Sequence, residues 1–139
     1  MEHGIVLKPE ILGYIGLLPI TNTLLFGWIA IALLTVASLV ISRKVALVPA
    51  GFQNLTELVI DFGHNTVEEL AHEKTKLIFP VVMTFFLYIM VANWLGLFPG
   101  IGTITYHDQP LLRSINSDLN MTLSLAIMSA LITHIFALK

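Results

Sequence analysis

Three polar residues gather at the start of the last apolar segment of the chain and are its first candidates for chemistry. Asn116, Asp118 and Asn120 alternate just before a run that contains no charged residue. One interpretation is a helix N-cap, in which a side-chain oxygen accepts free backbone N–H groups and the helix dipole favours the acid. The other is a polar, hydrated mouth where protons or ions approach. The residues alone leave both open, and one residue can serve both.

His134 lies toward the other end of the same apolar segment. An ionisable residue inside a membrane segment is a functional candidate. A histidine near the membrane interface is also neutral at ordinary pH and can simply form a local hydrogen bond. Both interpretations of His134 stay open.

A second set of candidates follows an amphipathic pattern over residues 49–73. At helical spacing, four titratable side chains form one stripe on the polar half: Glu57, Asp61, His64 and Glu68. Such a helix should lie in the membrane interface rather than cross it. Lipid-binding helices carry Lys and Arg on this half, whereas the stripe is acidic, so a protein partner is the favoured neighbour. The alternative is a soluble amphipathic helix on a small core.

The composition sets the class of protein that must position these residues. Hydrophobic residues are 56% of the chain, charged residues 12%, and the mean hydropathy is +0.86. That charged share is roughly half the usual soluble value, and the apolar residues come in blocks of about twenty, as a bilayer core requires. A net charge of −2 without a basic stripe argues against nucleic acid as a partner.

Motifs for catalysis and cofactor binding are missing from the sequence. There is no cysteine, which excludes disulfides, cysteine zinc sites and thiol nucleophiles. The pair His72 and Glu73 lacks the second histidine of a zinc-protease helix, and neither a glycine-rich phosphate loop nor G-x-S-x-G occurs. We therefore expect no catalytic, metal-binding or cofactor-binding residue in this chain.

The hydropathy blocks predict an all-α integral membrane protein with three transmembrane helices and one cytoplasmic interfacial helix. A Thr-Asn-Thr cluster, residues 21–23, can cap the first of these helices. The expected elements are an external arm over 1–23, transmembrane helices over 24–41, 77–98 and 119–138, an amphipathic interfacial helix over 49–73, and an external loop over 99–117.

The distribution of lysine and arginine predicts an external N-terminus. With that orientation five basic residues lie inside and two outside, in agreement with the positive-inside rule. The inside residues are Arg43, Lys44, Lys74, Lys76 and Lys139, and the outside residues are Lys8 and Arg113.

Four strings of residues carry a resemblance to a known family. They are GLLPITNTLL (16–25), SRKVALVPAGFQNLTELV (42–59), FPVVMTFFLYIMVANWLGLFPG (79–100) and SDLNMTLSLAI (117–127). In order and spacing they resemble subunit a of the bacterial F-type ATP synthase, the membrane stator beside the rotating c-ring. The resemblance covers essentially the whole chain, and NWLGLFPG and DLNMTL are its more specific parts.

The resemblance implies a multi-pass subunit of the bacterial inner membrane that forms part of a proton half-channel scaffold. The coupling ion, H⁺ or in some members Na⁺, would be its only small-molecule substrate. The implied partners are the c-ring, peripheral-stalk subunit b, other ATP synthase subunits and the lipid bilayer. The resemblance also implies that Asp118 and Asn120 lie near the outer half-channel and that the acidic stripe lies by the stalk. Asn116 and His134 remain proton-path candidates by residue type.

The sequence departs from the family at its end. The family continues with two long tilted helices that carry its essential arginine and the acid and histidine of the outer channel. Lys139 precedes all of these, and Arg113 lies in the predicted external loop and cannot replace the arginine. We therefore expect the N-terminal scaffold portion of such a subunit. The alternative from another class is a small membrane assembly protein without transport activity, which the lack of mid-membrane charge favours.

Overall fold

The computed structural model describes residues 9–43, 45–46, 51–106 and 109–138. Part of the predicted arm (1–8), the first two residues of the predicted amphipathic helix (49–50) and three basic residues of the orientation count (Lys8, Lys44 and Lys139) lie outside the described residues. The chain forms two compact units, which we describe separately: Met1–Ile31 with Ile89–Lys139, and Ala32–Tyr88.

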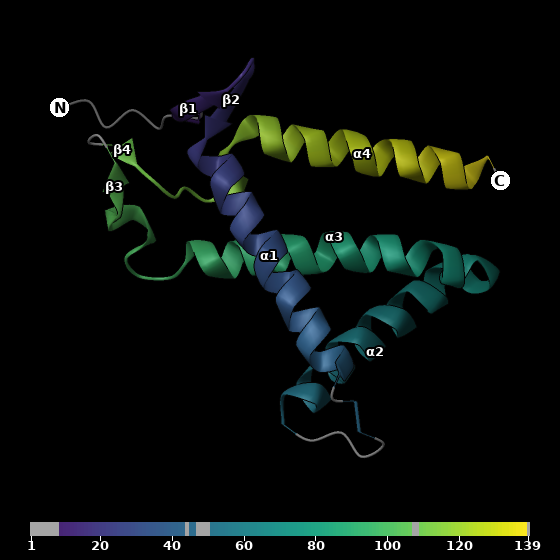
Figure 1. The fold of residues 1–139 in the computed structure, drawn as a ribbon. Coiled ribbons are helices and arrows are strands. Elements are labelled where there is room, and N and C mark those ends of the chain that lie inside the picture. The colour runs from purple at the N-terminus through teal and green to yellow at the C-terminus, as the bar shows by residue number, and fades with distance from the viewer. Residues whose placement is uncertain (1–8, 44, 47–50, 107–108, 139) are drawn as a thin grey trace. The chain divides into compact units, whose positions relative to one another are not determined.

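The first unit opens with a β-hairpin that leads directly into a long helix (Figure 1). Strands β1 (Ile11–Ile15) and β2 (Leu18–Thr21) are antiparallel, and Ile15 pairs with Leu18 across the turn. Gly16 in this turn has a φ of +63°, which glycine adopts without steric cost. Helix α1 (Asn22–Arg43) follows at once. The sequence predicted no strands here because this short hairpin lacks an alternating apolar pattern.

Helix α1 begins with the cap that the Thr-Asn-Thr cluster predicted. The Thr21 hydroxyl oxygen accepts the backbone N–H of Leu24 at 3.2 Å, which satisfies one of the free donors of the first turn. The helix starts two residues before the predicted span and ends two residues after it, at Arg43.

The rest of the first unit is an irregular connection and a final helix. After α3 (Thr75–Gly96) come the 3₁₀ turn η2 (Ile101–Thr103) and the short antiparallel strands β3 (Thr105–Tyr106) and β4 (Gln109–Pro110). A second 3₁₀ turn, η3 (Ile115–Ser117), precedes α4 (Leu119–Ala137). The buried apolar side chains of this unit come from α1, α3 and η3: Phe26, Ala30, Ala92 and Ile115.

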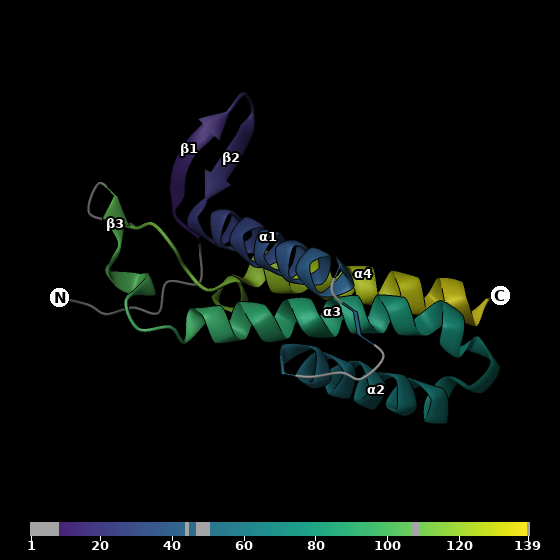
Figure 2. The ribbon, with the colours of Figure 1, turned by 60° about the horizontal axis from the view of Figure 1, so that its bottom comes forward.

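The second unit is built around a helical turn-back. Helix α2 (Phe52–Ala71) passes through the 3₁₀ turn η1 (His72–Lys74) into the first part of α3 (Figure 2). Two contacts hold this reversal: the His72 backbone N–H donates to the Glu68 carbonyl, and the Thr75 hydroxyl donates to the His72 carbonyl at 2.6 Å. Thr75 itself is buried.

Three helical stretches are long and apolar enough to cross a membrane: Asn22–Arg43, the continuous stretch Phe52–Gly96 and Leu119–Ala137. Within the middle stretch the apolar part is α3. No residue of α4 is buried in the described chain, so its apolar surface needs lipid or another chain around it. The predicted all-α membrane fold is confirmed, with the two short hairpins as additions.

Candidate functional site

Asp118 is the N-cap residue of α4. Its backbone is extended, with φ −103° and ψ +117°, and its side chain accepts the Asn120 backbone N–H at 2.9 Å through Oδ1. The Asp118 carbonyl accepts the Thr122 N–H at 3.1 Å and begins the helix. The cap that the sequence suggested is therefore present, and an acid at this end of a helix also complements its dipole.

The same carboxylate is buried and bonded to a distant helix. Asp118 is 3% exposed, and its Oδ2 accepts the Thr23 hydroxyl of α1 at 2.9 Å. Thr23 is fully buried. A carboxylate removed from water is stable only where hydrogen bonds replace its hydration, and here both of its oxygens accept one.

Asn22, next to Thr23, connects α1 to two further segments. Its Oδ1 accepts the backbone N–H of Thr23 at 2.9 Å and that of Glu10 at 3.3 Å, and its Nδ2 donates to the Pro110 carbonyl at 3.2 Å. The side chain is fully buried. We refer to Asn22, Thr23 and Asp118 as the Asp118 cluster.

A second contact ties the end of α3 to the segment before α4. The Asn116 amide nitrogen donates to the Asn93 side-chain oxygen, and Gly96 lies against Ser114, whose Oγ would be 3.0 Å from a Cβ at residue 96. The three predicted proton-path residues at this end therefore differ in exposure: Asn120 is exposed, Asn116 is partly exposed and Asp118 is buried.

His134 lies in the last turn of α4 and is exposed. Its Nδ1 is 2.8 Å from the Ala130 carbonyl of the same helix, the local hydrogen bond that the sequence left as one of its two interpretations. His134 and the Asp118 cluster occupy opposite ends of α4, so no described contact brings them together.

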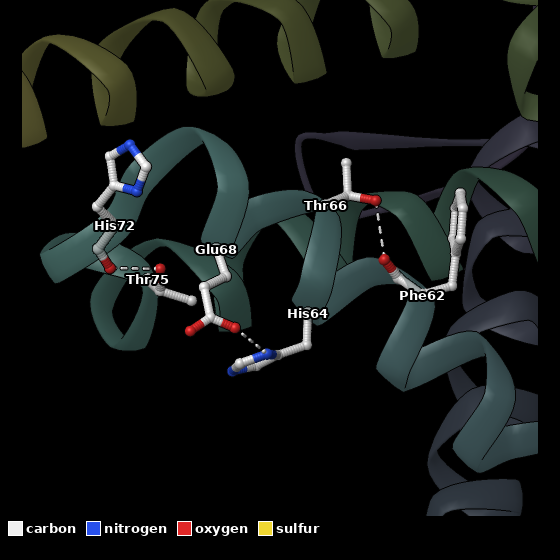
Figure 3. A network of polar contacts seen from close by, with 6 residues as sticks. All are labelled: Phe62, His64, Thr66, Glu68, His72 and Thr75. Atoms are coloured by element: carbon white, nitrogen blue, oxygen red, sulfur yellow. Dashed lines mark hydrogen bonds and ion pairs between the residues drawn. The ribbon is translucent and has the colours of Figure 1, made fainter.

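The acidic stripe of α2 is engaged in part within its own unit (Figure 3). His64 Nδ1 is 3.5 Å from Glu68 Oε2, and the His64 ring meets the edge of Phe79 with centroids 5.1 Å apart. Glu57 accepts a hydrogen bond from Gln53 at 2.7 Å, and Asp61 is exposed. Side chains of Glu68 and His64 remain 62% and 44% exposed, so the stripe is available to a partner.

The apolar half of α2 is mostly unburied. Val67 is its one buried residue in the described chain. The close approach to α3 uses Gly63, where an added Cβ would lie 2.7 Å from the Met83 sulfur. The large apolar side chains that the helical pattern placed together are at least half exposed, which is typical of a surface that needs lipid or protein around it: Phe52, Leu55, Phe62 and Leu70.

Sequence reasoning placed Asn22 and Thr23 in a capping cluster but did not identify them, Asn93 or Ser114 as partners of the segment before α4. The partners of Asn93, Asn22 and Thr23 in that segment lie 23, 88 and 95 residues away, which no local pattern indicates. Within the described part of the chain, no three His, Asp or Glu side chains gather as metal ligands.

Three apolar helices of membrane-spanning length and a polar cluster where α1 and α4 begin define a multi-pass α-helical membrane protein. A family model described as ATP synthase A chain matches residues 24–139. The chain belongs to the ATP synthase A chain family.

Curated relatives named ATP synthase subunit a agree with this assignment. The chain is 34% identical over 118 residues to the protein of Geobacter sulfurreducens, covering 85% of this chain and 47% of the relative. It is 32% identical over 126 residues to that of Legionella pneumophila, covering 90% and 50%. With the protein of Cereibacter sphaeroides it shares 44% identity over 91 residues, covering 63% and 34%. The chain thus spans about half the length of the curated relatives it matches.

Proposed function

We propose that the chain acts as the N-terminal portion of a membrane stator subunit in a bacterial rotary ATP synthase, where it forms part of the proton half-channel scaffold beside the c-ring. The observation that carries the proposal is family membership over residues 24–139. The arrangement of polar groups supports it, because buried hydrogen-bonding side chains gather where α1 and α4 begin, whereas no residue of α4 itself is buried in the described chain.

The proton-path candidates that solvent reaches in this proposal are Asn116 and Asn120 at the outer end of α4 and His134 at its inner end, and Asp118 is the fourth predicted residue, buried beside the first two. At the outer end Asn120 is exposed and Asn116 is partly exposed, which suits groups that meet incoming water. None of the four lies in the middle turns of α4. They therefore suit an approach to a channel rather than a complete relay across the membrane.

The acidic stripe is the proposed contact with the peripheral stalk, whose membrane subunit is subunit b. Asp61 and Glu68 are exposed on α2, and a negative face is repelled by anionic lipid headgroups. A protein surface of opposite charge is the better neighbour. The other ATP synthase subunits complete the set of proposed partners.

The proposed location is the bacterial inner membrane, with the β1–β2 hairpin and the loop before α4 outside. The lysine and arginine distribution supports this orientation, since Arg43, Lys74 and Lys76 then face the cytoplasm and Arg113 faces outward.

The proposal is tested by purification and by transport. The chain carrying an N-terminal affinity tag should recover c-ring, stalk and other ATP synthase subunits from bacterial membranes in mild detergent. Inverted vesicles from cells lacking the gene should lose ATP-driven proton uptake, and a plasmid copy should restore it. An untagged strain is the control for purification.

Two results would contradict the proposal. One is recovery of the chain without any ATP synthase subunit. The other is undiminished proton uptake in vesicles from the deletion strain. Recovery with incomplete complexes alone would favour the second candidate, a membrane assembly protein without transport activity. The observation that favours this second candidate is the absence of Asp, Glu, Lys and Arg from α4.

A further inference from the structure

The Asp118 cluster joins segments that lie far apart in the sequence. Thr23 and Asp118 are 95 residues apart, and Asn22 and Pro110 are 88 apart. Asn22, Thr23 and Asp118 are 0%, 0% and 3% exposed. These three account for most of the buried polar residues in the described chain, the other being Thr75 in the second unit.

An ordinary N-cap needs only its own helix. Asp118 Oδ1 makes that local bond to the Asn120 N–H. Oδ2 faces away from α4 and accepts the Thr23 hydroxyl of α1 at 2.9 Å. A buried hydrogen bond to a charged group is among the stronger polar contacts in proteins, and removal of one partner leaves the other unsatisfied.

We propose that Asp118 is a positioning residue, which holds the start of α4 against the start of α1 through Thr23, and that it does not exchange protons with the outer solution. A proton-exchanging acid must be reached by water, whereas this carboxylate is covered and both of its oxygens are occupied. At this end of α4 the polar side chains that solvent reaches are those of Asn120 and, in part, Asn116. The inference refines the role of Asp118 within the proposed function, and its structural part stands without that function.

The donors and acceptors of the Asp118 cluster predict which substitutions preserve its hydrogen bonds. In Asp118→Asn the amide oxygen still accepts the Asn120 N–H, and the amide nitrogen can donate to the Thr23 hydroxyl oxygen. The Thr23 proton then has Thr21 Oγ1 as an acceptor, 3.1 Å away. Asp118→Ala removes both contacts, Thr23→Val removes the contact with α1, and Thr23→Ser keeps it.

The first measurement is hydrogen exchange at the backbone of residues 119–124 in the purified complex. Thr23→Val should raise the exchange rate there by about tenfold, for the loss of one buried bond, and Asp118→Ala, which removes two bonds, should raise it by at least as much. Thr23→Ser and Asp118→Asn should stay within about threefold of the unchanged protein. The response to Thr23→Val is decisive, because a purely local cap would not feel a change in α1.

The second measurement is ATP-driven proton uptake in inverted vesicles as a function of the pH inside the vesicles, because the outer end of α4 faces the vesicle interior in this preparation. Asp118→Asn should keep most of the uptake rate with an unchanged pH profile. Thr23→Val and Asp118→Ala should lower the rate together, and the double variant should be no slower than the slower single variant.

Two outcomes overturn the proposal. Unchanged exchange at 119–124 in Thr23→Val would show that α1 does not hold α4. Loss of uptake in Asp118→Asn with normal exchange would make Asp118 a proton-exchanging group. If no variant and not even the unchanged complex took up protons, the proposed function would fail, while the exchange experiment would still decide whether the positioning contact exists.

Discussion

Single residues in this chain show how backbone conformation and close approach restrict side-chain choice. His72, between α2 and α3, has a φ of +46°, in the left-handed region that favours glycine. Gly96 lies where a side chain would meet Ser114. Both positions stand at helix ends, where the chain must change direction.

At His72 we expect glycine to be more stabilising than alanine. A Cβ in the left-handed region costs about 1–2 kcal/mol, and glycine avoids that cost. The free energy of unfolding in detergent should therefore be about 1 kcal/mol higher for His72→Gly than for His72→Ala. In an ordinary helical position the order is reversed, so a more stable alanine variant would contradict the strain at this turn.

At Gly96 we expect a larger side chain to be destabilising. A Cβ there would lie 3.0 Å from Ser114 Oγ and 3.2 Å from Ser114 Cβ. Gly96→Val should lower the free energy of unfolding by about 1–3 kcal/mol, as overpacking does. Ser114→Gly in the same chain should recover most of the loss. Gly13→Val is the matched control, because no atom lies within 4 Å of a Cβ added at that residue. Equal effects at residues 13 and 96 would disprove the close approach.

At the scale of elements, α2 has three distinct surfaces. Gly63 and Val67 belong to the side that is covered, with Gly63 against Met83 of α3. Leu55 and Phe62 are more than half exposed. The acidic stripe occupies a third side, and the His64–Glu68 pair lies at its end nearest the turn (Figure 3). His64 also contacts Phe79 there. Each surface calls for a different neighbour: a helix, an apolar environment and a protein of opposite charge.

Charge reversal of the stripe tests its proposed contact with the stalk. Glu57→Lys, Asp61→Lys and Glu68→Lys together should leave folding nearly intact, because exposed pairs such as His64–Glu68 contribute less than about 1 kcal/mol. The triple variant should bind anionic vesicles more tightly, by roughly 1 kcal/mol per added base. It should also no longer co-purify with the stalk.

Two controls separate charge at the stripe from charge in general. Asn54→Lys with Asn65→Lys adds bases beside the stripe. This double variant should bind anionic vesicles more tightly and should still co-purify with the stalk. Glu57→Gln with Asp61→Asn removes charge at nearly constant shape and should weaken co-purification in part. If the triple variant bound lipid more tightly and still co-purified with the stalk to the same extent, the stripe would face water.

At the scale of the whole molecule, the proposed orientation predicts where reagents reach the chain. Leu17 at the tip of the β1–β2 hairpin is 99% exposed, and Glu69 on α2 is exposed. With the N-terminus outside, Leu17→Cys should react with a membrane-impermeant maleimide in intact cells, and Glu69→Cys should react only after the cells are opened. The chain has no native cysteine, so the unchanged protein is the blank. Labelling of residue 69 in intact cells would reverse the orientation.

Local sequence patterns were sufficient to predict the membrane class, the three apolar helices, the caps at Thr21 and Asp118, and the family. Hydropathy and capping depend on neighbours within a few residues, so a single sequence contains them. The periodicity of α2 also identified its acidic stripe, but not that Gly63 would make the close approach to α3 while the large apolar side chains of the helix stay exposed.

The polar residues that meet one another could be identified from the folded chain alone. Thr23 and Asp118 look like two separate helix caps in the sequence, and the carboxylate that could have been a hydrated group is instead buried against α1. The Asn93–Asn116 and Asn22–Pro110 contacts were equally invisible. The physical reason is that a buried polar group must find a hydrogen-bond partner, but its type does not specify where along the chain that partner lies. Asp118 is therefore buried because the first turns of α1 and α4 pack together, and no local sequence pattern indicates this.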